Sequence, residues 1–238
     1  MTTRPRLLIL IDTISAVLFL AATGLVFFYA PVEKVMGLVQ KVFYFHVAAG
    51  WAGMLGFLVA AVAGIALLST NERKWDVLGL ASVEVGMLFA LINVVTGSIW
   101  ARPTWNTWWT WDPRLTTAVI MMLIYSAYFM LRSGIDDPHR RARFASVYTI
   151  IGFLSVPMTF FSARMFRTIH PIVISANQLV ESSQFGATGA FDMSPRMLLT
   201  FLFSLLAFSF VFASFLWNRV QLGKLLEEVE ILQLEETE

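Results

Sequence analysis

The sequence predicts an all-α integral membrane protein with six transmembrane helices. Of its 238 residues, 58% are hydrophobic and only 14% are charged, whereas a soluble domain carries about 25% charged residues. The apolar residues gather in six segments, each near the roughly 20 residues that a helix needs to cross a bilayer. The predicted spans are residues 7–29, 42–68, 78–100, 116–131, 144–165 and 197–217.

The first predicted span follows a short basic region and in that respect resembles a signal peptide. Its apolar run of about 23 residues is longer than the roughly 7–15 of a secretory apolar region, so we interpret it as a retained first helix. Of the five connections between the predicted spans, the first four are short and the fifth, residues 166–196, is longer. No segment between the spans is long enough to bury a core of its own. The prediction is therefore one membrane domain, residues 1–217.

The final segment, residues 218–238, is polar and becomes acidic after Lys224. Its pattern of leucines and glutamates is compatible with an amphipathic helix, but we interpret it as a solvated, cytoplasmic polar tail.

Basic residues set the predicted orientation, because cytoplasmic loops carry an excess of Lys and Arg. One side has ten of them and the other has seven. The bias is clearest in the loop 132–143, RSGIDDPHRRAR, which we place in the cytoplasm. Both termini are then cytoplasmic, and the connections 100–116 and 166–196 lie outside, on the periplasmic side in a bacterium.

Two features of composition exclude whole classes of function. The chain has no cysteine, which excludes a disulfide scaffold, a cysteine-ligated metal, a CxxC redox pair and covalently attached c-type haem. Its net charge of +1 indicates no nucleic-acid partner.

The segment 100–116, WARPTWNTWWTWDPRLT, has five of the eight tryptophans within twelve residues. Tryptophan belts are common at membrane interfaces, but that habit does not explain five indoles in one connection. If the segment is helical, with prolines at its two ends, four residues share one face: Trp105, Trp108, Trp109 and Asp112. We interpret it, Trp111 included, as an external aromatic surface suited to a large planar ligand.

Two of the three histidines are predicted at the same outer face as the tryptophans. His46 lies about one turn into the second span, and His170 follows the fifth. An ionisable residue at the edge of the apolar layer is a functional candidate, although a lone histidine there is commonly a hydrogen-bonded anchor. Two imidazoles beside an indole surface suit a bis-histidine haem site. Zinc fits less well, since it needs further ligands. His139, in the charged loop, is interpreted as solvated.

Three basic residues border this predicted site. Haem carries two propionates, and arginine binds carboxylates bidentately. Arg114 directly follows the tryptophans, Arg102 precedes them, and Lys41 lies five residues before His46. Each is a candidate partner for a propionate or, alternatively, for a lipid headgroup.

The tryptophan segment resembles the "WWD" signature of the haem-handling proteins of cytochrome c biogenesis. The run WNTWWTWD, residues 105–112, followed by DPRLT is similar to that of the six-span CcmC family. His46 and His170 match the two external axial histidines of that family. The chain departs from the family pattern at Asn106, where glycine is expected, and at Lys41, where arginine is frequent.

The resemblance implies a haem-delivery protein of the bacterial inner membrane rather than an enzyme. Its cargo would be haem b, held at the periplasmic face by the two histidines, the tryptophans, Asp112, Arg114 and Lys41, in a protein surrounded by membrane lipid. Its partners would be the haem chaperone CcmE, the CcmA–CcmB ABC transporter and the small subunit CcmD. The chain has no Walker motif, so ATP hydrolysis would belong to partners.

Two other functions compete with haem delivery. A membrane electron carrier of the cytochrome b kind would hold haem between paired histidines within spans, and only His46 lies in a span. A transporter could use the tryptophans as an aromatic cage for a cationic substrate.

Overall fold

The computed structural model describes residues 5–33, 36–170 and 193–235. Within them, six helical segments are long and apolar enough to cross a membrane, which confirms the predicted all-α, six-span architecture. They are Arg6–Tyr29, Gln40–Thr70, Lys74–Trp105, Pro113–Ser133, Pro138–Met165 and Pro195–Leu226.

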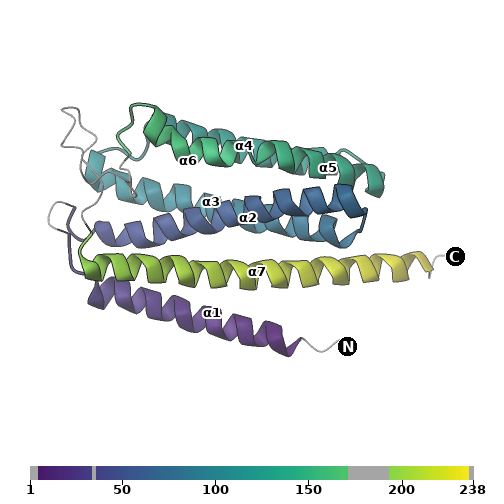
Figure 1. The fold of residues 1–238 in the computed structure, drawn as a ribbon, viewed down its shortest axis with the longest axis horizontal. Coiled ribbons are helices and arrows are strands. Elements are labelled where there is room, and N and C mark those ends of the chain that lie inside the picture. Colours follow the sequence, from purple (N-terminus) through teal and green to yellow (C-terminus); the bar gives the residue numbers. More distant parts are fainter. Residues whose placement is uncertain (1–4, 34–35, 171–192, 236–238) are drawn as a thin grey trace.

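The helices lie side by side in one elongated bundle (Figure 1). Helix α1 (Arg6–Gly24), which ends in a π-helical turn η1 (Leu25–Tyr29), packs against α7 (Pro195–Glu235). The next layer is the pair α2 (Gln40–Thr70) and α3 (Lys74–Trp105). The last layer is α4 (Pro113–Ser133) with α5 (Pro138–Gly152) and α6 (Ser155–Met165). The two described chain ends lie at the same end of the bundle (Figure 1), as six spans require.

The fifth span is broken into α5 (Pro138–Gly152) and α6 (Ser155–Met165). The cause is Pro157, which has no N–H for the carbonyl of Phe153 and whose ring would collide with it in a regular helix. The backbone N–H of Val156 bonds that carbonyl instead, at 3.0 Å. The second part, α6, packs against the start of α4, where the hydroxyl of Thr117 donates to that of Ser162 at 3.2 Å.

Helices α2 and α3 approach closely because small residues face one another. A Cβ added at Gly56 would lie 2.6 Å from the Cα of Gly86, so only glycine permits this contact. Small residues commonly allow such close packing between membrane helices. Helices α4, α5 and α7 pack against this central pair.

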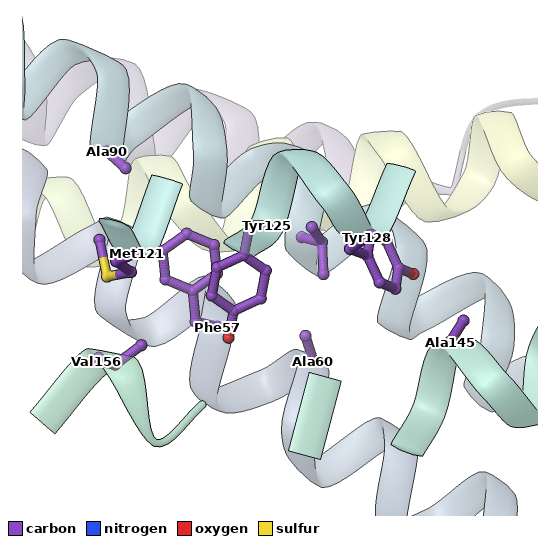
Figure 2. Close-up of a cluster of buried hydrophobic side chains, with 9 residues drawn as sticks. Phe57, Ala60, Ala90, Met121, Tyr125, Tyr128, Ala145 and Val156 are labelled. Carbon is purple, nitrogen blue, oxygen red and sulfur yellow. The ribbon is translucent and has the colours of Figure 1, made fainter. Parts of the chain in front are cut away.

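A cluster of buried side chains joins this central pair to α4 and α5 (Figure 2). Phe57 of α2 stacks on Tyr125 of α4, with ring centres 3.8 Å apart and planes 15° apart. Met121 and Val156 lie at one end of the cluster and Ala145 at the other (Figure 2). The stack therefore fills the middle of the bundle.

Polar contacts fasten the helices near the end of the bundle that carries the termini. The carboxylate of Asp76 accepts two bonds from the guanidinium of Arg132, at 2.6 and 3.0 Å, and both side chains are largely buried. Glu84 pairs with Arg219 at 2.5 Å. Asp12 accepts hydrogen bonds from Ser214 and Asn218 of α7. These acidic residues therefore connect helices α1, α3, α4 and α7.

The backbone of the C-terminal segment is helical up to Glu235, as a helix rather than an irregular tail would require. Helix α7 continues to Glu235 because the segment after Gly223 is rich in leucine and glutamate, which favour helix, and has no proline. The exposed side chains along it include Leu225, Val229 and Leu232.

Candidate functional site

His46 lies in the second turn of α2 and is anchored to α3. Its Nδ1 lies 2.9 Å from the backbone oxygen of Asn93, and the Asn93 amide donates back to the His46 backbone oxygen at 2.8 Å. Asn93 therefore makes an interhelical hydrogen bond between α3 and α2. Because a carbonyl oxygen only accepts, Nδ1 carries the proton, and Nε2 is the nitrogen left for a ligand.

The ring of His46 fits because Gly97 of α3 has no side chain. A Cβ at Gly97 would lie 2.8 Å from Cε1 of His46 and 3.2 Å from its Nδ1. The absent side chain thus defines where the imidazole can lie.

His170 follows α6 and lies close to His46, although the two residues are far apart in the sequence. The two ring centres are 6.3 Å apart, with planes inclined by 42°. The backbone N–H of His170 donates to the hydroxyl of Thr168 at 3.0 Å, and that hydroxyl donates to the carboxylate of Asp112. Two histidines separated by 124 positions therefore form one pair.

The tryptophan segment is not a separate helix, so the predicted shared helical face is wrong. Helix α3 ends at Trp105 because Asn106 adopts a left-handed conformation, with φ 54° and ψ 24°, which asparagine tolerates better than most residues. Arg102 reinforces this end by donating to the Asn106 backbone and side-chain oxygens, at 2.7 and 2.6 Å.

The irregular stretch 106–112 then ends at a helix start. Asp112 is the N-cap of α4, since its carboxylate accepts the N–H of Leu115 at 2.9 Å, and Pro113 is the first helical residue. Proline favours that position because its missing N–H is not needed there. Pro113 thus begins a helix where the sequence suggested the end of one, and Pro103 lies inside the last turns of α3.

Three of the predicted tryptophans nevertheless reach the histidines. Trp105, Trp108 and Trp109 line a small hollow that we call the tryptophan pocket, together with His46 and His170. Trp105 presents an edge-to-face contact to His170, with centres 6.5 Å apart. The indole Nε1 of Trp109 is buried and has no hydrogen-bond partner in the described part of the chain.

Trp111 lies at the rim of this arrangement. Its side chain is 73% exposed and packs edge-to-face on Trp109, with centres 5.7 Å apart. It is not among the residues that line the tryptophan pocket, so its described contact supports Trp109 rather than the histidines.

A second and larger hollow, the main cavity, adjoins the tryptophan pocket and shares both histidines and Arg114 with it. Its volume is about 280 Å³. Its deep end is apolar and reaches Phe57, Met121 and Val156 of the central cluster. The histidine pair therefore lies between an aromatic pocket and an apolar cavity.

The basic residues predicted at the site separate into two groups. Arg114 lines both hollows and donates to the backbone oxygen of Thr159 in α6. Lys41 instead donates to the backbone oxygens of Val26 and Phe27, at 2.9 and 2.8 Å. Lys41 lines neither hollow in the described part of the protein.

Arg164 is a cavity residue that sequence reasoning did not single out. It lies in the last turn of α6 and lines the main cavity with Arg114. Its place on the outer side was evident from the sequence, but its approach to Arg114 depends on the packing of α6 on α4. Thr168 was missed for the same reason.

The fold and this site define a class: a six-helix membrane protein with a histidine pair set beside a tryptophan-rich connection. A family model described as CcmC, Heme exporter protein C, matches residues 1–235. The chain belongs to this CcmC family. The six apolar helices and the bacterial members of the family identify it as a multi-pass protein of the inner membrane.

Several curated relatives carry the name Heme exporter protein C. The protein of Bradyrhizobium diazoefficiens is 35% identical over 141 residues, which cover 59% of this chain and 54% of the relative. That of Rhodobacter capsulatus is 32% identical, over 63% of each chain. That of Escherichia coli K12 is 31% identical, over 60% of this chain and 59% of the relative. The alignments thus span less than two thirds of these relatives.

Proposed function

We propose that this protein binds haem b as cargo and delivers it for cytochrome c maturation, with His46 and His170 as the two axial ligands of the iron. The observation that carries the proposal is the 6.3 Å between the two ring centres. A metal–imidazole bond of about 2 Å, plus about 1.1 Å from the ring nitrogen to the ring centre, gives a separation of roughly 6 Å across one metal ion.

The second ligand shell of His46 supports the same proposal. Metal-binding histidines characteristically donate their other ring N–H to a carbonyl or carboxylate, which fixes the ring and raises its basicity. The contact between Nδ1 of His46 and the Asn93 backbone oxygen has this form. In the described residues, no group of three or more His, Cys, Asp or Glu side chains could hold a metal, which favours haem over a zinc site.

The surrounding groups suit a porphyrin. Trp105, Trp108 and Trp109 offer aromatic surface for stacking on the flat ring, with Trp111 as an outer support. The apolar end of the main cavity suits a hydrocarbon edge, and Arg114 suits a propionate. Asp112, through Thr168, would hold the connection that carries His170.

The position of His170 favours delivery over electron transfer. In a cytochrome b-type carrier both histidines lie within helices and the haem is enclosed between them. Here His170 lies outside a helix, because α6 ends at Met165. We place both termini in the cytoplasm and the histidine pair at the periplasmic face, from which CcmE could take the haem. The protein would act as a non-catalytic subunit beside CcmA, CcmB and CcmD, with ATP hydrolysis in those partners.

The test is the absorption spectrum of the protein purified from haem-replete cells. We expect a Soret band, weaker haem retention in His46→Ala and in His170→Ala, and no bis-imidazole spectrum in the double variant. His139→Ala is the matched control, because His139 is an exposed residue at the start of α5. Colourless wild-type protein that binds choline-type cations tightly would favour the aromatic-cage transporter instead.

A further inference from the structure

Two arginines border the main cavity on neighbouring helices. Arg114 lies in the first turn of α4, and Arg164 lies in the last turn of α6. Their guanidinium carbons are 5.9 and 5.0 Å from the centre of the same ring, that of Phe160. A cation is attracted to the face of an aromatic ring, so Phe160 helps to keep both charged groups beside one another at the cavity.

Lys41, which the sequence suggested as a propionate partner, makes other contacts. Its ammonium bonds the carbonyls of Val26 and Phe27, in the π-helical turn η1. Carbonyls at the end of a helix have no partner within it, so Lys41 joins the end of the first span to the start of α2. The second positive charge at the cavity comes from α6 instead.

A ligand with two carboxylates suits this pair of arginines. Two guanidinium groups near one apolar cavity repel each other, and a dianion replaces that repulsion by two attractions. Each guanidinium can also bind a carboxylate through two parallel hydrogen bonds. Arg164 is exposed, so the carboxylates would remain at the rim, where water reaches them.

The opposite end of the cavity fixes which edge of the ligand enters. Phe57, Met121 and Val156 line it there, and burying a carboxylate among such side chains would be costly. A molecule with a hydrocarbon edge and a dicarboxylate edge therefore has one favourable orientation.

We propose that Arg114 and Arg164 form a dicarboxylate subsite that holds the two propionates of the haem, with Arg164 in the place suggested for Lys41. The inference rests on the proposed function, because haem is the dicarboxylate in question. Its consequence is a defined orientation of the cargo: propionates at the rim between α4 and α6, and the hydrocarbon edge toward Phe57.

The experiment compares haem with its dimethyl ester, in which both propionates are blocked. The full chain in lipid nanodiscs is titrated with each compound, and the dissociation constants are read from the Soret band. We expect the wild type to prefer haem to the ester by about 100-fold, because each of the two arginines should contribute about tenfold through its hydrogen bonds to a carboxylate. Arg164→Gln should weaken haem binding by about tenfold and leave the ester unchanged. Arg164→Lys should recover part of the loss.

Arg167→Gln is the matched control, since Arg167 is exposed three residues further on and does not line the main cavity. It should not alter the preference for haem over the ester. An Arg164→Gln variant that binds both compounds like the wild type, or loses both equally, would refute the subsite. A selective loss of haem in Lys41→Gln alone would return the role to Lys41. If the wild type binds neither compound, it is the proposed function itself that fails.

Discussion

Replacement of Gly97 by alanine should weaken haem binding without touching any proposed ligand. The new methyl group would lie 2.8 Å from Cε1 and 3.2 Å from Nδ1 of His46, whereas ordinary van der Waals contact begins at 3.4 Å. The ring must therefore move by several tenths of an ångström. That movement disturbs the 2.9 Å contact between Nδ1 and the Asn93 backbone oxygen. Loss of the hydrogen bond that orients a metal-binding histidine costs about 10- to 100-fold in metal affinity, or roughly 1.4–2.7 kcal/mol.

The assay is a haem titration of each variant in nanodiscs, with the thermal unfolding temperature measured in parallel. Gly24→Ala is the matched control, because a Cβ at Gly24 meets nothing within 4 Å. Alanine favours helix over glycine by about 1 kcal/mol, so neither variant should unfold through loss of helix propensity. If Gly97→Ala binds haem as tightly as Gly24→Ala does, the position of the His46 ring beside Gly97 does not determine haem affinity, and His46 does not hold the haem in this position.

Three further outcomes are expected. Single Trp→Phe changes at Trp105, Trp108 and Trp109 should each weaken haem binding by at most about 0.5–1.5 kcal/mol, whereas the triple alanine variant should lose the haem; a folded triple variant with full occupancy would contradict stacking. Asp112→Ala should lower haem affinity more than Asp112→Asn, measured by titration, because asparagine keeps one acceptor oxygen for the N–H of Leu115 and alanine keeps none; equal losses would contradict this. Arg132→Met should lower the unfolding free energy by about 3 kcal/mol, because it leaves the buried Asp76 carboxylate with only the more distant Arg73, at 3.9 Å; chemical unfolding in detergent measures this, and an unchanged value would refute it.

The six spans could be predicted from the sequence because each needs only a continuous apolar segment. The number of spans also predicted that His46 and the tryptophans lie at the same membrane face. Successive connections alternate between the two faces, and these residues lie at the first and third connections. The contact between Asn93 and His46 could not be predicted, because it depends on the register between α2 and α3. Glycines such as Gly56 and Gly86 set this register. Nothing in the sequence shows which residue of the other helix each glycine will face.

The tryptophan segment shows where spacing alone is insufficient. The positions 105, 108, 109 and 112 fit a helix, yet two local signals outweigh that spacing. Asn106 ends α3 in the left-handed conformation, and Asp112 with Pro113 starts α4. An Asp-Pro pair is typical of a helix start, so this boundary was readable in the sequence. Arg164 was not, because its approach to Arg114 arises only when α6 packs on α4.

The electron paramagnetic resonance spectrum of the ferric haem complex tests the central claim most directly. Two imidazole ligands give low-spin, six-coordinate iron, so the wild type should show a low-spin signal. His46→Ala and His170→Ala should each convert it to a high-spin signal, because one axial position opens. A low-spin signal that persists unchanged in both single variants would contradict ligation of the iron by this pair.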